Sequence, residues 1–401
     1  MVLSNSLITA FKAAPATSFP SYESTDFFRF ELLHESKISR ARVGRIHTPH
    51  GIIDTPGFVP VGTNGALKGM TNEQSLAAGV QLMFCNTYHL LVHPGPEVIS
   101  QAGGLHKFMR RDLPIITDSG GFQVFSLASS TADDGPELKR RSATRGRNEG
   151  TLLTTSERGV RFRSYFDSST LLLTPESSVQ AQKAFGADII IPLDELPPNG
   201  VSGERLLQSV GLSHRWMARS LTEHLSDRRQ QAMYGVVHGG TERKLRAASV
   251  DYLSSLPFDG FAVGGSLGAN KAEMMELLQF VMPLLPPERP NHLLGIADPE
   301  SVLTATPLGV DTFDSCFPTR VARHGTLLTR AGPVHIRQGK YRNQFGPIDP
   351  TMPTLECSRA YLHHLNRMHE PLFDTLASMH NIQFMTTLMA ELRERILADD
   401  L

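Results

Sequence analysis

Asp314 is the side chain whose position along the chain best suits chemistry. It lies in the segment DTFDSCFPTR, directly after a short apolar run, and Arg320 and Arg323 follow it closely. In parallel α/β folds, ligands bind at the carboxyl ends of the strands, so an acid placed there favours a catalytic role. On this segment alone, a structural aspartate that caps a turn or pairs with Arg320 remains the alternative.

Two further acids follow apolar runs in the same way. Asp118 lies in TDSGGFQ, and Asp194 lies in PLDE. Two carboxylates that act across an anomeric carbon are what glycosidic chemistry requires: one attacks or stabilises the carbon, and the other handles protons. We therefore expect Asp118, Asp194 and Asp314 to converge on one mouth of the fold.

Glycine pairs and the types of the neighbouring residues narrow this chemistry. Gly239-Gly240 and Gly264-Gly265 lack Cβ atoms, so their backbone N–H groups can approach a flat ligand. A metal-dependent barrel hydrolase is the alternative use of clustered acids, but no His-x-His or His-x3-His pattern accompanies them. The three cysteines are far apart and form neither a disulfide framework nor a paired metal-ligand spacing.

The elements that must position these acids repeat eight times. Each unit is a short apolar run, a Gly- or Asp-marked turn and a helical pattern with capping signals. The eight runs are 58–61, 82–84, 114–117, 188–193, 233–237, 260–263, 292–296 and 310–313. This repetition predicts an α/β fold, a (β/α)8 TIM barrel over about 54–325, with active residues on the loops that follow the strands. A doubly wound open sheet is the structural alternative.

The flanking segments differ from the barrel in pattern. Residues 1–25 are rich in Ser, Ala, Thr and Pro and predict a disordered tail. Short alternating runs then predict an N-terminal antiparallel strand cap, which completes a catalytic domain over 26–325. Residues 128–158 are polar and predict a mobile insertion whose basic run, 139–147, is solvated. Residues 326–401 predict a C-terminal helical subdomain.

Charge is balanced over the whole chain but not locally. The formal net charge is -1, so a nucleic-acid partner would need a local basic patch. No acid occurs from residue 315 to 348, where cations gather at Arg320, Arg323, Arg330, Arg337, Lys340 and Arg342. We interpret this strip as phosphate-facing. No apolar run reaches the roughly 20 residues that span a bilayer, so we expect a cytoplasmic protein without a membrane partner.

A set of motifs in order resembles the tRNA-guanine transglycosylases, in particular the bacterial type. The resemblance extends in register from about Phe28 to Leu397 and rests on GTNG with KGMT, NTYHL, TDSGGFQ, FDGFAVGG, FD with PTR, and SRAYLHHL. It implies a (β/α)8 enzyme that exchanges the wobble guanine of tRNAs with a GUN anticodon for a 7-deazaguanine base. The implied mechanism is a double displacement through a covalent enzyme-tRNA intermediate, and the family precedent favours a homodimer.

The resemblance assigns roles residue by residue. Asp314 matches the nucleophile and Asp118 the general acid/base. Asp194 matches the carboxylate that accepts N–H bonds from the guanine edge, and Phe122 and Leu294 match the residues that sandwich the base. The other expected base-site residues are His238, Gly239, Gly264, Gly265, Ser266 and Gly268, and the expected tRNA-binding residues are Arg320, Arg323, Lys340 and Arg342.

The chain departs from the family pattern at four places. His238 replaces a glutamine, Ser315 replaces a common cysteine, and the loop after Gly265 is one residue shorter. Gly268 then stands where the bacterial pattern has valine, which leads to the hypothesis that a wider pocket takes queuine in preference to 7-aminomethyl-7-deazaguanine. The alternative is that Leu267 refills the space and leaves the bacterial specificity.

The fourth departure concerns the family's C-terminal zinc site, which uses three closely spaced cysteines and a distant histidine. Only Cys357 and His380 remain as candidate ligands, so we predict no metal and no cofactor. A non-catalytic tRNA-binding paralogue would share the fold. It should lack the nucleophile or the acid/base, and both are present here.

Overall fold

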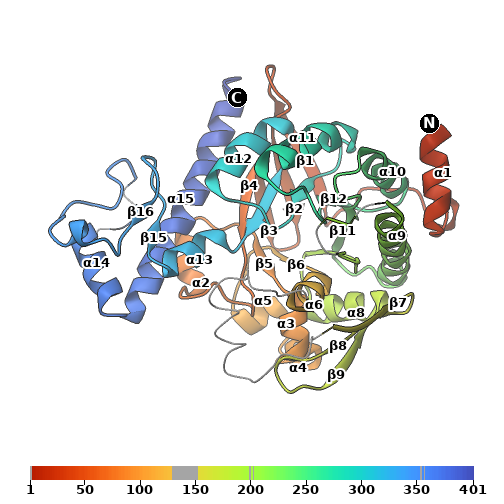
Figure 1. Cartoon of the computed structure of the whole chain (residues 1–401), viewed down its shortest axis with the longest axis horizontal. Coiled ribbons are helices and arrows are strands. Elements are labelled where there is room, and N and C mark those ends of the chain that lie inside the picture. The colour runs from red at the N-terminus through yellow and green to blue at the C-terminus, as the bar shows by residue number, and fades with distance from the viewer. Residues whose placement is uncertain (1, 129–151, 198–199, 202, 353–354, 356) are drawn as a thin grey trace. The chain divides into compact units, whose positions relative to one another are not determined.

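The computed structural model describes residues 2–128, 152–197, 200–201, 203–352, 355 and 357–401 (Figure 1). Eight strands form one sheet in the order β4-β14-β13-β12-β11-β10-β6-β5. The pairs β10–β11, β11–β12, β13–β14 and β14–β4 are parallel. The strands are β4 Gly57–Pro60, β5 Met83–Cys85, β6 Ile115–Thr117, β10 Ile189–Ile190, β11 Ala232–Val237, β12 Gly260–Val263, β13 Asn291–Leu293 and β14 Thr312–Ser315.

The sheet closes because its two end strands meet. Val61, after β4, forms a parallel bridge with Phe84 of β5, and the N–H of Gly62 donates to the Phe84 carbonyl at 2.7 Å. Every residue of the eight strands is buried, which explains why these segments read as continuous apolar runs and not as alternating ones. The predicted (β/α)8 barrel is thus confirmed, and each of the eight predicted runs overlaps one strand.

Helices follow the barrel strands and begin where the capping signals predict. Thr71 and Gln74 form a capping box, and Asp298 accepts a bond from the Ser301 N–H. The helices are α2 Asn72–Ala77, α3 Thr87–Val92, α4 Pro96–Gln101, α5 Leu105–Met109, α6 Gly121–Ala128, α8 Pro175–Phe185, α9 Gly203–Ser226, α10 Arg243–Ser254, α11 Lys271–Val281, α12 Pro299–Ala305 and α13 Phe317–Arg323.

Smaller sheets and two helices complete the fold. The predicted N-terminal cap is the antiparallel sheet of β1 Arg29–Glu35, β2 Arg42–Thr48 and β3 Gly51–Thr55. The C-terminal region contains the hairpin of β15 Thr326–Leu327 and β16 Val334–His335, followed by α14 Arg359–Arg367 and α15 Pro371–Leu397. None of the helices in the described ranges is long and apolar enough to cross a membrane.

The chain divides into two compact units that interleave along the sequence. The first unit comprises residues 1–24, 86–104 and 117–286, and the second comprises 25–85, 105–116 and 287–401. Asp118 and Asp194 belong to the first unit, and Asp314 belongs to the second. Each unit is described by itself below.

Two predictions about flexible segments are wrong in part. Residues 1–25 are not a disordered tail, because Val2–Phe11 form α1 and the Phe11 side chain is fully buried against α9 and α10. The insertion 128–158 ends in ordered structure, since β7 Leu152–Ser156 pairs with β8 Gly159–Arg163, which pairs with β9 Thr170–Leu173. The basic run 139–147 lies outside the described residues.

Candidate active site

Asp118 lies directly after β6 among four hydrogen-bond donors of the first unit. Its Oδ1 accepts bonds from the backbone N–H groups of Thr87 at 2.7 Å and Gly120 at 3.1 Å. Its Oδ2 accepts bonds from the side-chain amides of Asn86 at 2.7 Å and Gln123 at 2.9 Å. Burial raises the pKa of Asp118 to about 6, because desolvation outweighs these donors. A carboxyl group with this pKa can gain and lose a proton near neutral pH.

The turn after Asp118 is built on two crowded glycines. Gly120 has a φ of +84°, and a Cβ there would lie 3.0 Å from the backbone nitrogen of Tyr88. A Cβ on Gly121 would lie 3.0 Å from the carbonyl oxygen of Asp194. The glycines therefore let the loop after β6 pack against the loop after β10, which brings two predicted site carboxylates into neighbouring backbone segments.

His238 follows β11 directly and binds the predicted base-reading carboxylate. Its Nε2–H donates to Asp194 Oδ2 at 2.8 Å, and both side chains are buried. A Cβ on Gly265 would lie 3.0 Å from His238 Nδ1, so this glycine leaves room for the imidazole ring. The structure thus brings together Asp194, His238 and Gly265. Among the described residues only His238 donates to the Asp194 side chain, which leaves Oδ1 for a ligand.

Arg246 of α10 anchors both glycine loops, and no sequence pattern revealed it. Its Nε donates to the carbonyl of Gly240 at 2.9 Å, and its Nη1 donates to the carbonyls of Val237 at 2.6 Å and Gly264 at 2.8 Å. Its Nη2 donates to the carbonyl of Ser266 at 2.9 Å. Arg246 is fully buried, and this desolvation lowers the pKa of its guanidinium to about 9. All four acceptors belong to the main chain, so Arg246 fixes the loops after β11 and β12.

Two predicted base-site glycines are required by the backbone. Gly239 has a φ of +144°, and a Cβ there would lie 2.6 Å from the nitrogen of Arg246. Gly268 has a φ of +114°, and a Cβ there would lie 2.7 Å from the Cβ of Glu273. The neighbouring Leu267 is buried. The space beside Gly268 is therefore filled by Glu273, and the argument that this glycine widens a pocket loses its physical basis.

Asp314 lies in β14 of the second unit and is held through one oxygen. Its Oδ1 accepts bonds from His292 Nε2 at 3.0 Å and from the Gly295 N–H at 2.7 Å. His292 Nδ1 contacts the Thr312 hydroxyl oxygen at 2.8 Å. The sequence does not predict that His292 and Gly295 contact Asp314. Both residues lie in the apolar run 292–296, which indicates only a strand. Within the described part of the chain Oδ2 of Asp314 accepts no bond, so one oxygen is fixed and the other is left to react.

The two residues predicted to sandwich the base lie on different elements. Phe122 is in the first turn of α6, and 60% of its side chain is exposed. Leu294 follows β13 directly and is half-buried in the second unit. An exposed aromatic ring four residues after a buried carboxylate is available to stack on a flat ligand. Phe122 therefore has the exposure that its predicted role requires.

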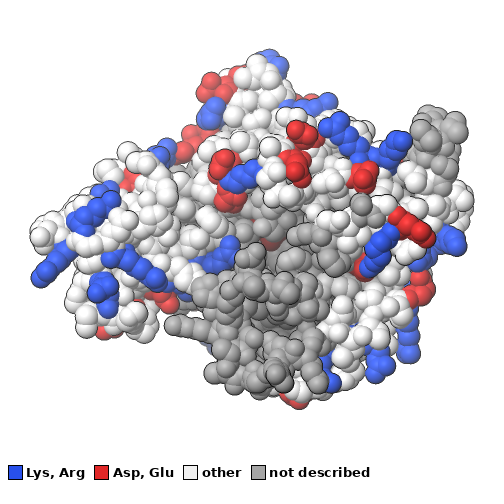
Figure 2. All heavy atoms as spheres, viewed as in Figure 1, with Lys and Arg blue, Asp and Glu red and all other residues white. Residues whose placement is uncertain are grey.

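The predicted phosphate-facing strip lies on surface elements of the second unit. Arg320 and Arg342 are exposed, and the Lys340 ammonium lies 5.0 Å from the centre of the Tyr341 ring. Arg323 is partly buried, and its Nη1 donates to the carbonyl of Thr319. Figure 2 shows lysine and arginine side chains gathered over the region of β15, β16 and α14, at the left of the view. The strip is thus available to an anionic partner.

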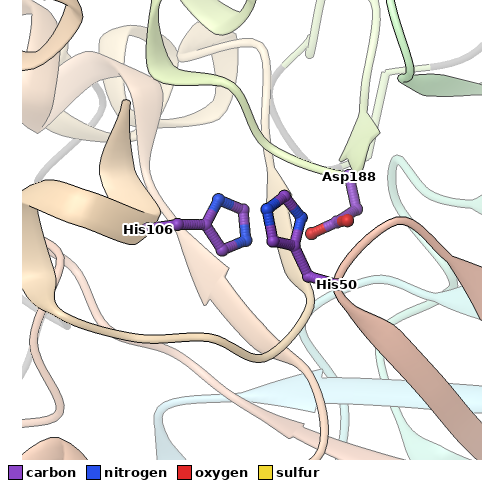
Figure 3. Close-up of side chains that lie close together, drawn as sticks. All are labelled: His50, His106 and Asp188. Atoms are coloured by element: carbon purple, nitrogen blue, oxygen red, sulfur yellow. The ribbon is translucent and has the colours of Figure 1, made fainter. Parts of the chain in front are cut away.

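A close pair of histidines lies in the second unit. Figure 3 shows the rings of His50 and His106 face to face, with centroids 3.5 Å apart and an interplanar angle of 12°. The figure also labels Asp188, which belongs to the first unit. Imidazole lone pairs lie in the ring plane, so one ion cannot lie in two nearly parallel planes at this spacing. We describe this stack as an aromatic contact and assign it no further role.

Buried carboxylates that follow the strands of a (β/α)8 barrel lie where enzymes with this fold have their active sites. A family model described as queuine tRNA-ribosyltransferase matches residues 37–401. The queuine tRNA-ribosyltransferase of Protochlamydia amoebophila is 54% identical over 93% of this chain and 96% of its own length. That of Chlamydia abortus is 51% identical over 92% of this chain and 99% of its own length. The chain belongs to the queuine tRNA-ribosyltransferase family and is a transglycosylase enzyme.

Proposed function

We propose that this protein exchanges the wobble guanine of tRNAs with a GUN anticodon for a 7-deazaguanine base, in queuosine tRNA modification. The observation that carries the proposal is the Asp314 carboxylate. His292 and Gly295 both bind Oδ1, so Oδ2 stays available in a strand-end position of a chain that belongs to this family. A carboxylate held in this way suits attack on an anomeric carbon.

The proposed reaction has two displacement steps, and in each step one bond to C1′ forms, another breaks and one proton is transferred. In the first, Asp314 Oδ2 bonds to C1′ of the wobble nucleotide, the bond from C1′ to the guanine nitrogen breaks, and protonated Asp118 gives its proton to the leaving base. In the second, the incoming base loses a proton to the Asp118 carboxylate, its nitrogen bonds to C1′, and the bond to Asp314 breaks. A pKa of about 6 supports both roles of Asp118.

Recognition of the base is assigned to residues of the first unit and to Leu294 of the second. Asp194 Oδ1 accepts N–H bonds from the guanine edge while His238 holds Oδ2. The Gly265 N–H donates to the base carbonyl, and Gly239, Gly264 and Ser266 complete the loops that Arg246 anchors. Phe122 and Leu294 stack on the ring faces. Guanine and 7-deazaguanine share the edge that is read, so one site can release the first and take the second.

The tRNA is assigned to the basic strip of residues 315–348 and to the C-terminal subdomain 326–401. The exposed cations Arg320, Lys340 and Arg342 can bind phosphates, and Arg323 can join them. An anticodon loop presents the wobble nucleotide unstacked at low energetic cost, as chemistry on a base requires. A tRNA substrate also supports a cytoplasmic location.

The identity of the inserted base is the finer part of the proposal. Glu273 fills the space beside Gly268, so the geometry no longer favours queuine over 7-aminomethyl-7-deazaguanine. Both bases carry the guanine edge that Asp194 reads. Competition between the two bases for one undermodified tRNA, followed by mass spectrometry of the wobble nucleoside, decides between them.

The C-terminal residues do not fit a closed zinc site, and the proposed activity uses none. His380 is buried, and its Nε2–H donates to the Leu328 carbonyl at 2.7 Å, so that nitrogen is not a ligand in this arrangement. Burial lowers the pKa of His380, although the Leu328 carbonyl and Asp349 oppose this shift. Cys357 packs against the C-terminal apolar core, and one thiolate with one imidazole is two ligands short of a closed tetrahedral zinc site. Stoichiometric zinc in elemental analysis after dialysis against a chelator would contradict this.

A homodimer is the proposed assembly. Phe345, Tyr361 and Met368 are large apolar side chains of the second unit that are exposed by 78%, 44% and 61%. Exposed apolar groups of this kind favour association with another surface. Sedimentation equilibrium at micromolar concentration tests the assembly, and a mass equal to one chain over the whole range would exclude it.

Labelled guanine and an undermodified tRNA test the activity directly. A transglycosylase incorporates the label without net loss of base from the tRNA. A non-catalytic tRNA-binding paralogue binds the tRNA but incorporates nothing, and a metal-dependent hydrolase releases product only with metal. Absence of label in tRNA at saturating guanine would overturn the proposed function.

A further inference from the structure

Within the first unit, the N-terminal segment contacts α9 and α10 through an aromatic stack and through two hydrogen bonds. Phe11, the last residue of α1, stacks on His214 of α9 with ring centroids 4.5 Å apart and an interplanar angle of 0°. Arg215 Nη1 donates to the Phe11 carbonyl at 2.7 Å, and the Tyr252 hydroxyl donates to the Ala14 carbonyl at 2.8 Å. The segment precedes residue 37, where the family match begins. It therefore adds contacts outside the matched region.

His214, beneath the Phe11 ring, has its hydrogens fixed by its neighbours. Its Nδ1 lies 2.6 Å from the Val210 carbonyl, which can only accept, so Nδ1 carries the proton. Burial lowers the pKa of His214 to about 3, so the ring is neutral and Nε2 is a lone-pair acceptor. The Ser249 hydroxyl lies 3.0 Å from Nε2 and donates to it. Each polar atom of the ring thus has one defined partner.

Ser249 connects His214 to His238, which binds the predicted base-reading carboxylate Asp194. While its hydrogen points at His214, its oxygen accepts the backbone N–H of His238 at 3.0 Å. His238 in turn binds Asp194 through Nε2 at 2.8 Å. Phe11, His214, Ser249, His238 and Asp194 therefore form one continuous series of contacts, and all five side chains are buried.

We propose that the N-terminal segment is a positioning element for base recognition, which acts through His214 and Ser249 on His238 and Asp194. This inference rests on the proposed function, because it assigns Asp194 to the base. Apolar packing alone would be served better by an aliphatic side chain at position 214, since a buried imidazole costs free energy unless both nitrogens are bonded. The bonded imidazole instead links the N-terminal segment, through Ser249, to the backbone of His238.

The test measures the KM for guanine, the KM for tRNA and kcat in the full-length protein. Ser249→Ala removes the hydroxyl that connects His214 to His238, and we expect the KM for guanine to rise roughly 5- to 10-fold with kcat and the KM for tRNA little changed. Phe11→Ala should raise the KM for guanine by about 3-fold. Because both act on one series, the double variant should show no more than the Ser249→Ala effect.

Ile8→Ala is the matched control. Ile8 lies on α1 and packs partly buried against the same apolar cluster as Phe11, and this change leaves the Phe11 ring in place. It should leave the KM for guanine unchanged. If the KM changes of Phe11→Ala and Ser249→Ala multiply in the double variant, the two residues act independently and the proposal is wrong. Equal changes in the KM for guanine in Phe11→Ala and Ile8→Ala would also overturn the proposal.

Hydrogen exchange separates this inference from the proposed function. The His238 N–H is bonded to Ser249, so a peptide that covers residues 234–240 should exchange faster in Ser249→Ala and Phe11→Ala than in Ile8→Ala. If the wild-type protein incorporates no guanine, the proposed function fails while the exchange result still decides the coupling. Equal exchange in all four proteins would show that the N-terminal segment does not reach His238.

Discussion

Each compact unit contains a buried carboxylate bound by a histidine, but the two histidines are held in different ways. In the second unit, His292 binds Asp314, and its other nitrogen contacts Thr312. His292 and Thr312 are register partners of the paired strands β13 and β14. In the first unit, His238 binds Asp194 from a loop, and its backbone is held by Ser249 of α10.

The two histidine–carboxylate pairs are therefore positioned by different kinds of interaction. The pair that holds the proposed nucleophile is built into one strand ladder, where position follows from local backbone pairing. The pair assigned to the base depends on side chains of α9, α10 and α1 that are far apart in sequence. The nucleophile should therefore tolerate distant substitutions, whereas base recognition should respond to them.

The largest expected effect is the loss of the nucleophile. Asp314→Ala should abolish guanine exchange and covalent trapping of tRNA, because no neighbouring carboxylate replaces Oδ2 on β14. Denaturing electrophoresis of enzyme mixed with labelled tRNA measures the trapped species. A denaturation-resistant adduct formed by Asp314→Ala would remove this residue from its role.

The next effect concerns proton transfer. Asp118→Asn cannot exchange a proton and should lower kcat by roughly 10²-fold or more. The amide would also meet the donor groups of Asn86, Thr87, Gly120 and Gln123, so circular dichroism and thermal unfolding must show that the variant is folded. A near-normal rate in a folded Asp118→Asn would exclude it as the acid/base.

Two histidine variants test the comparison itself. His292→Phe removes a bond to the charged nucleophile and should lower kcat by roughly 10- to 100-fold with little change in the KM for guanine. His238→Gln, which restores the family's residue type, should mainly change the KM for guanine. Steady-state kinetics with guanine varied at saturating tRNA separates these parameters. A dominant KM effect in His292→Phe would contradict the division between the units.

The smallest effect is on stability in acid. Burial lowers the pKa values of His214 and His224 to about 3, whereas an unfolded histidine titrates near 6.5. Between these values the unfolded chain binds more protons, so the free energy of unfolding should fall as pH drops, by up to about 1.4 kcal/mol per pH unit for each group. Urea unfolding of wild type and His224→Leu between pH 7 and 5 measures this, and equal pH slopes would contradict it.

The sequence predicts the barrel and its three carboxylates because both follow local rules. Buried parallel strands give short apolar runs, and an acid directly after such a run stands at the ligand-binding end. His292 and Arg246 follow no such rule, because one lies inside a strand and the other on a helix whose partners are main-chain carbonyls. Their roles depend on which groups the closed barrel brings beside them.

The N-terminal segment shows the same limit. Its composition is typical of a disordered tail, yet Phe11 is buried against His214. Local patterns could not predict this contact, because His214 lies about 200 residues later in the chain. For a related reason, the glycine at position 268 does not by itself indicate a wider pocket, and the preference for queuine stays a prediction. A smaller residue was expected to leave space, but Glu273 occupies that space and the backbone φ requires glycine.

Arg246 has a consequence for the redesign of base specificity. Its guanidinium donates to the main-chain carbonyls of residues 237, 240, 264 and 266, so the backbone of the proposed base site does not depend on the side chain at a position such as Ser266. Substitutions there can alter which base is selected while the loops keep their course. The same fold can therefore diverge in substrate choice by single replacements, whereas Arg246 itself must stay fixed for any such variant to work.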